Sequence, residues 1–195
     1  MATAFVSEQS FTQAEFADWM EHQTQPLPGR YELVDGHIVV TPPTRAQHGA
    51  VNVRIAALLS QHVSRRGLGK VLNSGYDLPS GDTLEPDVSF LSAARLGGVA
   101  FTDDERGFCR VVPDLVVEVL SRGTAHLDRN KKKSIYAKNR VAEYWMVDPK
   151  RRSVWLLYLG ATDYEEPSVI SSGPIDSRVL PGLTFTVEDV FAVLD

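Results

Sequence analysis

The sequence predicts an α/β or α+β protein in which a mixed β-sheet is flanked by helices. Three observations lead to this fold class. Three strand-like segments follow one another between helical segments at residues 45–66 and 128–139. A strand, a helix and a further strand then run from Glu118 to Tyr144, which is long enough for a right-handed parallel crossover. An Asp-Gly pair nearer the N-terminus predicts an additional β-hairpin.

The N-terminal part is expected to contain a helix, a hairpin and a second, longer helix. Thr12-Gln13-Ala14-Glu15 has the form of a capping box, which predicts a short amphipathic helix to about residue 22. Asp35-Gly36 separates two apolar-rich segments and predicts a hairpin over residues 31–40. Apolar residues recur at spacings of three and four over residues 45–66, and a glycine follows, which predicts a helix with a glycine cap.

The rest of the chain alternates strand-like and helical patterns. Segments rich in apolar and β-branched residues predict strands at 70–78, 86–91, 113–121, 143–148, 153–159 and about 183–186. Residues 128–139 predict the helix that follows the third of these strands, with Asp128 near its N-cap. A final helical turn is expected at residues 188–194.

Length and composition are typical of one globular domain. The chain has 195 residues, of which 43% are hydrophobic and 23% charged. We expect a single domain over residues 1–195, with a helical extension at 1–29, a core at 30–160 and a C-terminal extension at 161–195. No apolar run is long enough to span a membrane, and the N-terminus lacks the pattern of a secretory signal. With one cysteine and hence no internal disulfide, the expected location is cytoplasmic.

Charge is distributed unevenly along the chain. The net charge is −5, yet residues 122–140 carry seven cations and one acid. A basic segment in an acidic protein is suited to contact with a polyanion such as nucleic acid, and Arg129, Lys131 and Lys133 are its candidate contacts. The alternative is that this segment is simply the solvated face of a helix.

Glu118 lies inside the apolar segment at residues 113–121. Burying an ionised carboxylate costs several kcal/mol unless a partner or a metal compensates. Asp114, on the same strand, is not that partner. Four residues at roughly 3.3 Å each separate the two Cα atoms by about 13 Å, too far to share one ion. We therefore expect a structural role for Asp114 at the strand start.

Asp87 is the better partner for Glu118 because it begins the preceding strand-like segment. If these two strands are neighbours, the acids stand about 5 Å apart across the ladder. Like charges at that distance favour a divalent cation or a raised pKa. Oxygen ligands without a His-Cys cluster suit Mg²⁺ or Mn²⁺ rather than zinc. The alternative places each acid at a solvent-exposed strand end.

The helix at residues 128–139 offers a lysine to this pair of acids. Ile135 and Tyr136 are expected to face inward, and Lys132 precedes them by three and four residues, so it shares their side of the helix. Lys131 and Lys133 match this spacing less well and are expected to remain in solvent. Two acids on strands and a lysine nearby are the components of a metal-dependent phosphodiesterase.

Several motifs occur together and in a fixed order: Tyr31–Gly36, His48, Glu85–Val88, Pro113–Ser121, Asp128–Tyr136 and Glu143–Pro149. In this combination the chain resembles the Uma-two family of bacterial restriction-endonuclease-like proteins, part of the PD-(D/E)xK superfamily and long classed as a domain of unknown function. The resemblance covers residues 30–159 and continues weakly through 180–182. It implies the restriction-endonuclease-like fold, with Asp87, Glu118 and Lys132 at the nuclease core. Many such nucleases carry the lysine two residues after the glutamate, where this chain has Leu120.

The resemblance also implies a function, that of a Mg²⁺- or Mn²⁺-dependent DNA endonuclease. Asp87 and Glu118 would bind the metal with the Val119 carbonyl as a third ligand. The metal would activate water and neutralise charge on the scissile phosphate. Lys132 would orient that water or stabilise the transition state. Glu32 would complete the ligand set or hold the water, unless it is an exposed strand acid.

Other functions remain open at this stage. One is a catalytically silent nucleic-acid-binding or regulatory module with the same fold, and another is a dimeric scaffold. DNA is the expected substrate and a symmetric homodimer the expected assembly. His48 would contact a phosphate or another ligand, or else be a structural histidine. The chain lacks the motifs of zinc proteases, serine hydrolases and P-loop enzymes, which removes these classes.

Overall fold

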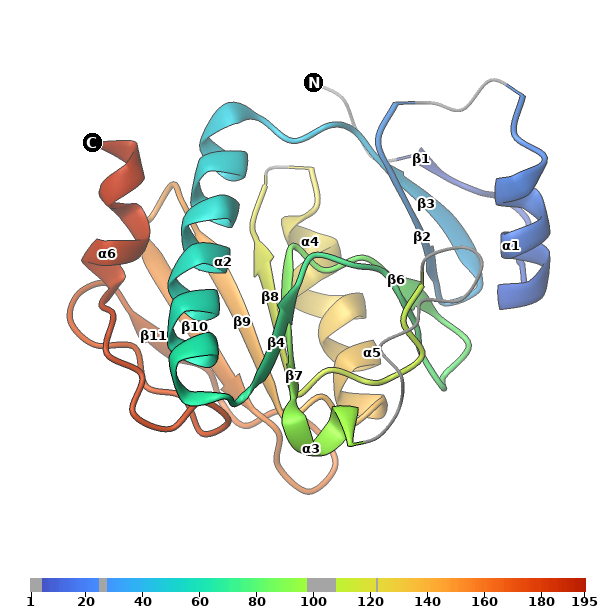
Figure 1. Ribbon diagram of the computed structural model, residues 1–195. Coiled ribbons are helices and arrows are strands. Elements are labelled where there is room, and N and C mark those ends of the chain that lie inside the picture. The colour runs from blue at the N-terminus through green and yellow to red at the C-terminus, as the bar shows by residue number, and fades with distance from the viewer. Residues whose placement is uncertain (1–4, 25–27, 98–107, 122) are drawn as a thin grey trace.

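The computed structural model of the chain describes residues 5–24, 28–97, 108–121 and 123–195. The strands of these residues form two sheets, which lie side by side in Figure 1. The larger sheet has six strands in the order β11-β10-β9-β8-β7-β4, and the smaller has five in the order β1-β3-β2-β6-β5. Within the described residues, no helix has the length and apolar character that crossing a bilayer requires.

The larger sheet consists of β4 (Gly69–Leu72), β7 (Val88–Ser92), β8 (Leu115–Val119), β9 (Glu143–Asp148), β10 (Ser153–Tyr158) and β11 (Ser168–Ile170). Its pairs are antiparallel except for β8 and β9, which are parallel. The sheet is therefore mixed, and the strand–helix–strand step after Glu118 joins two parallel neighbours, as the sequence predicts.

The smaller sheet consists of β1 (Phe5–Val6), β2 (Arg30–Val34), β3 (His37–Thr41), β5 (Tyr76–Asp77) and β6 (Thr83–Leu84). The predicted hairpin is confirmed as β2 and β3. Asp35 and Gly36 have φ angles of 50° and 77°, the left-handed pair that a tight primed turn requires. The hairpin thus belongs to a separate sheet that the sequence did not predict as such.

The helical elements are α1 (Gln13–Glu21), α2 (Ala46–Arg66), α3 (Ala93–Leu96), α4 (Ala125–Leu127), the π-helical turn η1 (Asp128–Lys132), α5 (Lys133–Lys138), α6 (Val187–Phe191) and the 3₁₀ turn η2 (Ala192–Leu194). The capping box of α1 forms as predicted, with Thr12 and Glu15 bonded reciprocally. The predicted long helix is α2, and Gly67 ends it in the left-handed conformation at φ 63°.

Side chains alternate between the two faces of β8. Val117 and Val119 pack with the apolar stripe of α2, whereas Val116 and Leu120 pack with α5 and the smaller sheet. In Figure 1, α2 crosses one side of the large sheet, and α4 and α5 lie on the side toward β2 and β6. Glu118 has the same parity as Val116 and Leu120, so its side chain is directed to the side of α5.

Three predicted elements differ from the structure. The single strand expected at residues 70–78 is divided, because the chain leaves the larger sheet after β4 and enters the smaller one at β5. The strand expected at 183–186 is reduced to one bridge, Pro174 with Thr186, because Thr186 caps α6. The helix expected to begin at Asp128 begins instead at Ala125, so Asp128 is not its N-cap.

Candidate active site

Asp87 and Glu118 are brought together by the pairing of β7 with β8. Val88 is opposite Val117 in this antiparallel pair, which places Asp87 at the end of the ladder where Glu118 lies. The Val119 amide donates to Asp87 Oδ2 at 2.8 Å, which locks this register. Both acids are only 2% exposed, so the alternative of solvent-exposed strand ends is wrong.

Lys132 reaches Glu118 from the helical segment. Its Nζ lies 3.0 Å from Glu118 Oε1, 2.8 Å from Glu32 Oε1 and 3.8 Å from Asp128 Oδ1. The side chain is buried, whereas Lys131 pairs with Asp35 at 3.2 Å and Lys133 approaches Asp163 at 4.0 Å. The structure thus places Lys132, and neither of its neighbours, against the acids.

Three buried polar residues form a stripe along this helical segment. Asp128, Lys132 and Tyr136 follow one another at intervals of four, so their side chains share one face. Tyr136 donates its hydroxyl hydrogen to Glu118 Oε1 at 2.9 Å, the same oxygen that Lys132 contacts. The first half of the stripe lies on η1, and π-helical turns are frequent at functional sites.

Asp87 is held by basic side chains on two other elements. Arg30, at the start of β2, donates from Nη2 to Asp87 Oδ1 at 2.8 Å. His48, in the first turn of α2, places Nε2 3.2 Å from Asp87 Oδ2. Burial by itself would raise the pKa of Asp87, but the hydrogen bond from His48 and the charge of Arg30 outweigh it and lower the pKa to about 2.

Glu118 has the opposite electrostatic environment. Burial raises its pKa, the charge of Lys132 opposes that rise, and the nearby charges of Asp128 and Asp87 add to it, so the pKa reaches about 8. Burial likewise raises the pKa of Asp128, to about 6, despite the charge of Lys132. Burial would lower the pKa of Lys132, but Glu118 and the other acids around it raise that pKa instead.

The cluster contains more carboxylates than cations. Glu32 is buried, which excludes the exposed alternative for it, and it accepts from the Glu85 amide as well as from Lys132. An excess of carboxylate oxygens fits a hard divalent cation and offers little to a soft one. Among the described residues, however, no three acidic, histidine or cysteine side chains converge as a ready metal site. Asp87 and Glu118 are a pair of candidate ligands that needs further oxygens.

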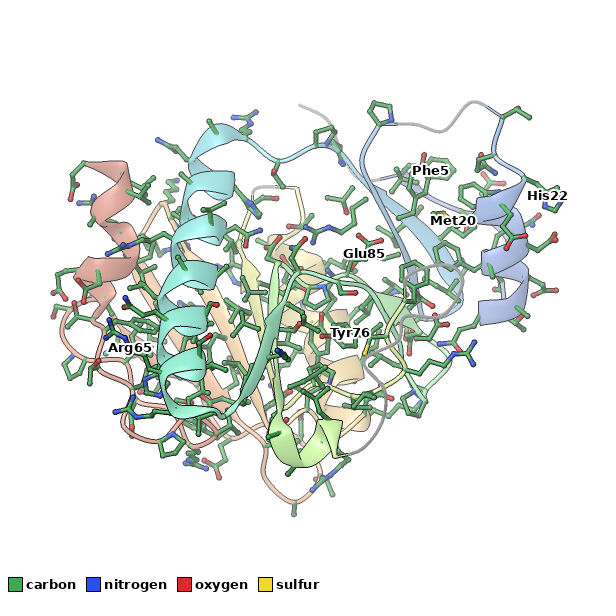
Figure 2. The ribbon with its side chains drawn as sticks, viewed as in Figure 1. Phe5, Met20, His22, Arg65, Tyr76 and Glu85 are labelled. Carbon is green, nitrogen blue, oxygen red and sulfur yellow. The ribbon has the colours of Figure 1, made fainter. Side chains whose placement is uncertain are left out.

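A cleft of about 270 Å³ opens beside this cluster. It is lined by Arg30, Asn73, Ser74, Gly75, Glu85, Pro86 and Phe108. Glu85 lies between the two sheets in Figure 2, and burial raises its pKa while the charge of Arg30 opposes that rise. The cleft therefore brings solvent to Arg30, which contacts Asp87 directly.

The remaining candidate nucleic-acid contacts are not gathered at the acids. Arg129 lies 3.6 Å from Asp148 and places its guanidinium 5.2 Å from the centre of the Trp155 ring. Lys131 and Lys133 are near separate surface acids, Asp35 and Asp163. Arg122, which also belongs to the basic segment, lies outside the described residues. A role of these cations in nucleic-acid binding stays a prediction.

Sequence reasoning missed three residues of the cluster. Arg30 lies just before the predicted hairpin, outside any charge pattern, so nothing local indicated its contact with Asp87. Tyr136 was expected to face inward but not to bind Glu118. The sequence favours a helix cap for Asp128, and its spacing of four from Lys132 is the signal that indicates a place at the site.

Asp114 lies outside the cluster, as its strand spacing predicts. It accepts from the Ser92 amide and from Arg95 Nε, at 2.7 and 2.8 Å, and so joins the strand start to α3.

The fold and the sequence both have known counterparts. The structure is similar to the crystal structure of a putative nuclease belonging to DUF820 from Anabaena variabilis, with a TM-score of 0.73, 18% identity, and coverage of 94% of this chain and 99% of that one. At this identity the likeness establishes a shared fold. No curated protein matches the chain. The sequence model described as "Uma2: Putative restriction endonuclease" matches residues 14–188, in agreement with the resemblance noted from the motifs. The chain therefore belongs to the Uma2 family of putative restriction endonucleases.

Proposed function

We propose that the protein is a divalent-cation-dependent DNA endonuclease that hydrolyses phosphodiester bonds. The observation that supports this most directly is Lys132, which lies within 3.0 Å of both Glu118 and Glu32 in a buried cluster beside Asp87. A buried lysine shared by acids from different strands has no evident role in cohesion that apolar residues could not fill at lower cost.

Asp87 and Glu118, with the Val119 carbonyl, are the residues that would hold Mg²⁺ or Mn²⁺. Burial, and after it the charges of nearby carboxylates such as Asp128 and Asp87, raise the pKa of Glu118 against the opposing charge of Lys132, and a bound cation would favour the ionised form. When bound, such a cation lowers the pKa of a coordinated water and neutralises charge on a phosphate.

The protein's own groups have defined tasks in this scheme. Lys132 is an ammonium with three donors. Glu32 and Glu118 lie at hydrogen-bond distance from it, and Asp128 is farther away at 3.8 Å, so the third donor would serve an attacking water or a phosphoryl oxygen. Glu32 keeps the ammonium in place from the side of the smaller sheet. Tyr136 and Lys132 together orient Glu118 through one of its oxygens.

We also propose a homodimer in the cytoplasm as the acting form. One site cleaves one strand, and a twofold axis between two copies would present a second site to the opposite strand of a duplex.

Cleavage of supercoiled plasmid is the direct test. We expect nicked and linear DNA with Mg²⁺ or Mn²⁺ and none with chelator. The cleavage rate should fall by at least about 100-fold in Glu118→Gln and Asp87→Asn, because each change removes a carboxylate that would bind the metal at the reacting centre. Asp114→Asn is the matched control, since it alters a carboxylate on the same strand segment outside the cluster.

Each outcome of this test has a distinct meaning. If the DNA stays intact with Mg²⁺ and with Mn²⁺, the proposed endonuclease function is wrong. DNA retained by the protein in a gel shift but not cut would favour the silent binding module instead. Equal cleavage by wild type and Glu118→Gln would show that the activity belongs to a different site or to a contaminant.

A further inference from the structure

Arg30 lies between the cleft and the candidate metal ligands. Its Nη2 donates to Asp87 Oδ1 at 2.8 Å and its Nη1 donates to the Glu85 carbonyl at 2.6 Å. The Glu85 carboxylate is more distant, at 3.8 Å from Nε. The Arg30 side chain is 23% exposed and forms part of the cleft wall. The Arg30 side chain is therefore hydrogen-bonded to Asp87 and also accessible to solvent.

Arg30 and a divalent cation would draw on the same carboxylate. Asp87 Oδ2 accepts from the Val119 amide and lies near His48, and Arg30 occupies Oδ1. A cation bound to Asp87 would be repelled by a guanidinium a few ångströms away. The two positive groups thus compete for Asp87, although the guanidinium has a second possible partner within the cleft.

That second partner is chemically defined by the cleft. Among its lining residues in the described parts of the chain, Arg30 supplies the cationic side chain, Asn73 and Ser74 supply neutral polar groups, and Glu85 supplies a carboxyl group 3.8 Å from Arg30 Nε. A guanidinium presents a planar fork of donors that matches the oxygens of a phosphate. A phosphodiester that entered the cleft would meet Arg30 before it reached the buried acids.

We propose that Arg30 is a phosphate-binding residue that exchanges Asp87 for a phosphodiester oxygen of the substrate. The proposal rests on the proposed function and deepens it, because it assigns a substrate contact to a side chain that otherwise looks like a structural partner of Asp87. In this scheme DNA binding withdraws the guanidinium from Asp87 and leaves that carboxylate to the metal.

The proposal predicts effects of opposite sign in one variant. In Arg30→Gln, Mn²⁺ binds more tightly, because a competing positive charge has been removed from Asp87. An adjacent Arg alters the proton affinity of an Asp by roughly 10- to 1,000-fold, and we expect a gain in Mn²⁺ affinity on the order of ten-fold. Duplex DNA binds more weakly in the same variant, because a phosphate contact is lost. A merely structural role for Arg30 would weaken both.

The experiment measures both quantities on the intact protein. Calorimetry gives the Mn²⁺ affinity without DNA, and titration of a short duplex in Ca²⁺ or with chelator gives the DNA affinity over a range of salt concentrations. The logarithm of DNA affinity decreases with the logarithm of salt concentration. We expect this slope to be less steep by about 0.9 in Arg30→Gln, the value for one lost phosphate contact. Arg95→Gln is the matched control, because Arg95 forms a similar half-buried pair with Asp114 at 2.8 Å outside the cleft.

A second variant keeps the test decisive if Arg30→Gln does not fold. Arg30→Lys retains the charge but loses the planar fork, so Mn²⁺ affinity should stay within about two-fold of wild type while DNA affinity falls. Weaker or unchanged Mn²⁺ binding in Arg30→Gln, or an unchanged salt slope, would overturn the proposed role of Arg30. Neither result would contradict the proposed endonuclease function. Absence of Mn²⁺ binding by the wild type would overturn the proposed function and this inference together.

Discussion

At the scale of single residues, the unusual feature of the site is that two donors share one oxygen of Glu118. Lys132 and Tyr136 both contact Oε1, at 3.0 and 2.9 Å. This arrangement holds the carboxylate in one rotamer and directs its other oxygen elsewhere. It also explains why a tyrosine, whose ring could be replaced by phenylalanine in an apolar core, is found at this position.

Tyr136→Phe tests this arrangement with the loss of one hydroxyl. Glu118 would be ionised when it binds a metal, and a hydrogen bond to a charged group contributes about 1.5–3 kcal/mol, so we expect Mn²⁺ affinity to fall by roughly ten-fold or more. Tyr164→Phe is the matched control, because that buried hydroxyl donates to the Val141 carbonyl and not to the site. Equal Mn²⁺ affinities for the two variants in calorimetry would contradict a positioning role for Tyr136.

Part of the site could be predicted at this scale. The apolar context of Glu118 and the helical spacing of Lys132 are local patterns, and both residues lie where those patterns place them. Arg30 could not be predicted in the same way, because its contact with Asp87 depends on how the smaller sheet meets the larger one. The same holds for Glu32, whose burial results from that long-range packing.

At the scale of elements, α2 and its C-terminal cap contain two glycines in contrasting conformations. Gly49 lies in the first turns of the helix, and Gly67 is its left-handed cap at φ 63°. A methyl group added at either position would have no atom of a more distant part of the chain within 4 Å. Any change in stability on substitution by alanine therefore reflects backbone conformation and not packing.

We expect the same substitution to have opposite effects at these two positions. Gly49→Ala should raise the free energy of unfolding by roughly 0.5–1 kcal/mol, because alanine favours helical backbone. Gly67→Ala should lower it by about 1–2 kcal/mol, because a side chain disfavours the left-handed conformation. Urea unfolding of both variants beside wild type checks the pair, and a shift of the same sign in both would contradict this account.

The elements themselves were predictable where their signals are local. The capping box of α1, the Asp-Gly turn and the glycine cap of α2 each depend on a few adjacent residues. The division of residues 70–78 between two sheets was not predictable, since both halves favour extended backbone and only tertiary packing separates them. The π-helical turn at η1 likewise has no signature in its sequence.

At the scale of the whole molecule, the buried acids couple stability to pH. The Glu118 carboxyl has a pKa of about 8 when folded and an ordinary value of 4.5. Between these values the folded chain retains a proton that the unfolded chain has released, so raising the pH favours unfolding. Asp128, with a pKa of about 6, adds to the same trend at lower pH.

We therefore expect stability to fall as pH rises from about 5 to 8. Urea unfolding in the presence of chelator should show a decreasing free energy of unfolding for wild type and a flatter dependence for Glu118→Gln, which has no proton to release. The difference between the two proteins isolates Glu118 from other titrating groups. If the difference in free energy of unfolding between wild type and Glu118→Gln stays constant over this pH range, the raised pKa of Glu118 is contradicted.

The C-terminal segment is integral to this molecule. Ile175, Leu180, Phe185, Val187 and Phe191 pack in the same core as α2 and the larger sheet. Glu143, at the start of β9, accepts from Ser177 and from the amides of residues 178 and 179. We propose on this basis that residues 161–195 belong to one domain with residues 30–160. Sequence composition suggested a single domain but did not indicate this shared core.

The position of Lys132 on the crossover between β8 and β9 also bears on the order of events during synthesis. A growing chain leaves the ribosome N-terminus first, so Glu32, Asp87 and Glu118 emerge before the lysine that gathers them. β9, the parallel neighbour of β8, emerges later still. A nascent chain therefore has no assembled site, and the proposed activity against DNA begins only after the crossover has folded.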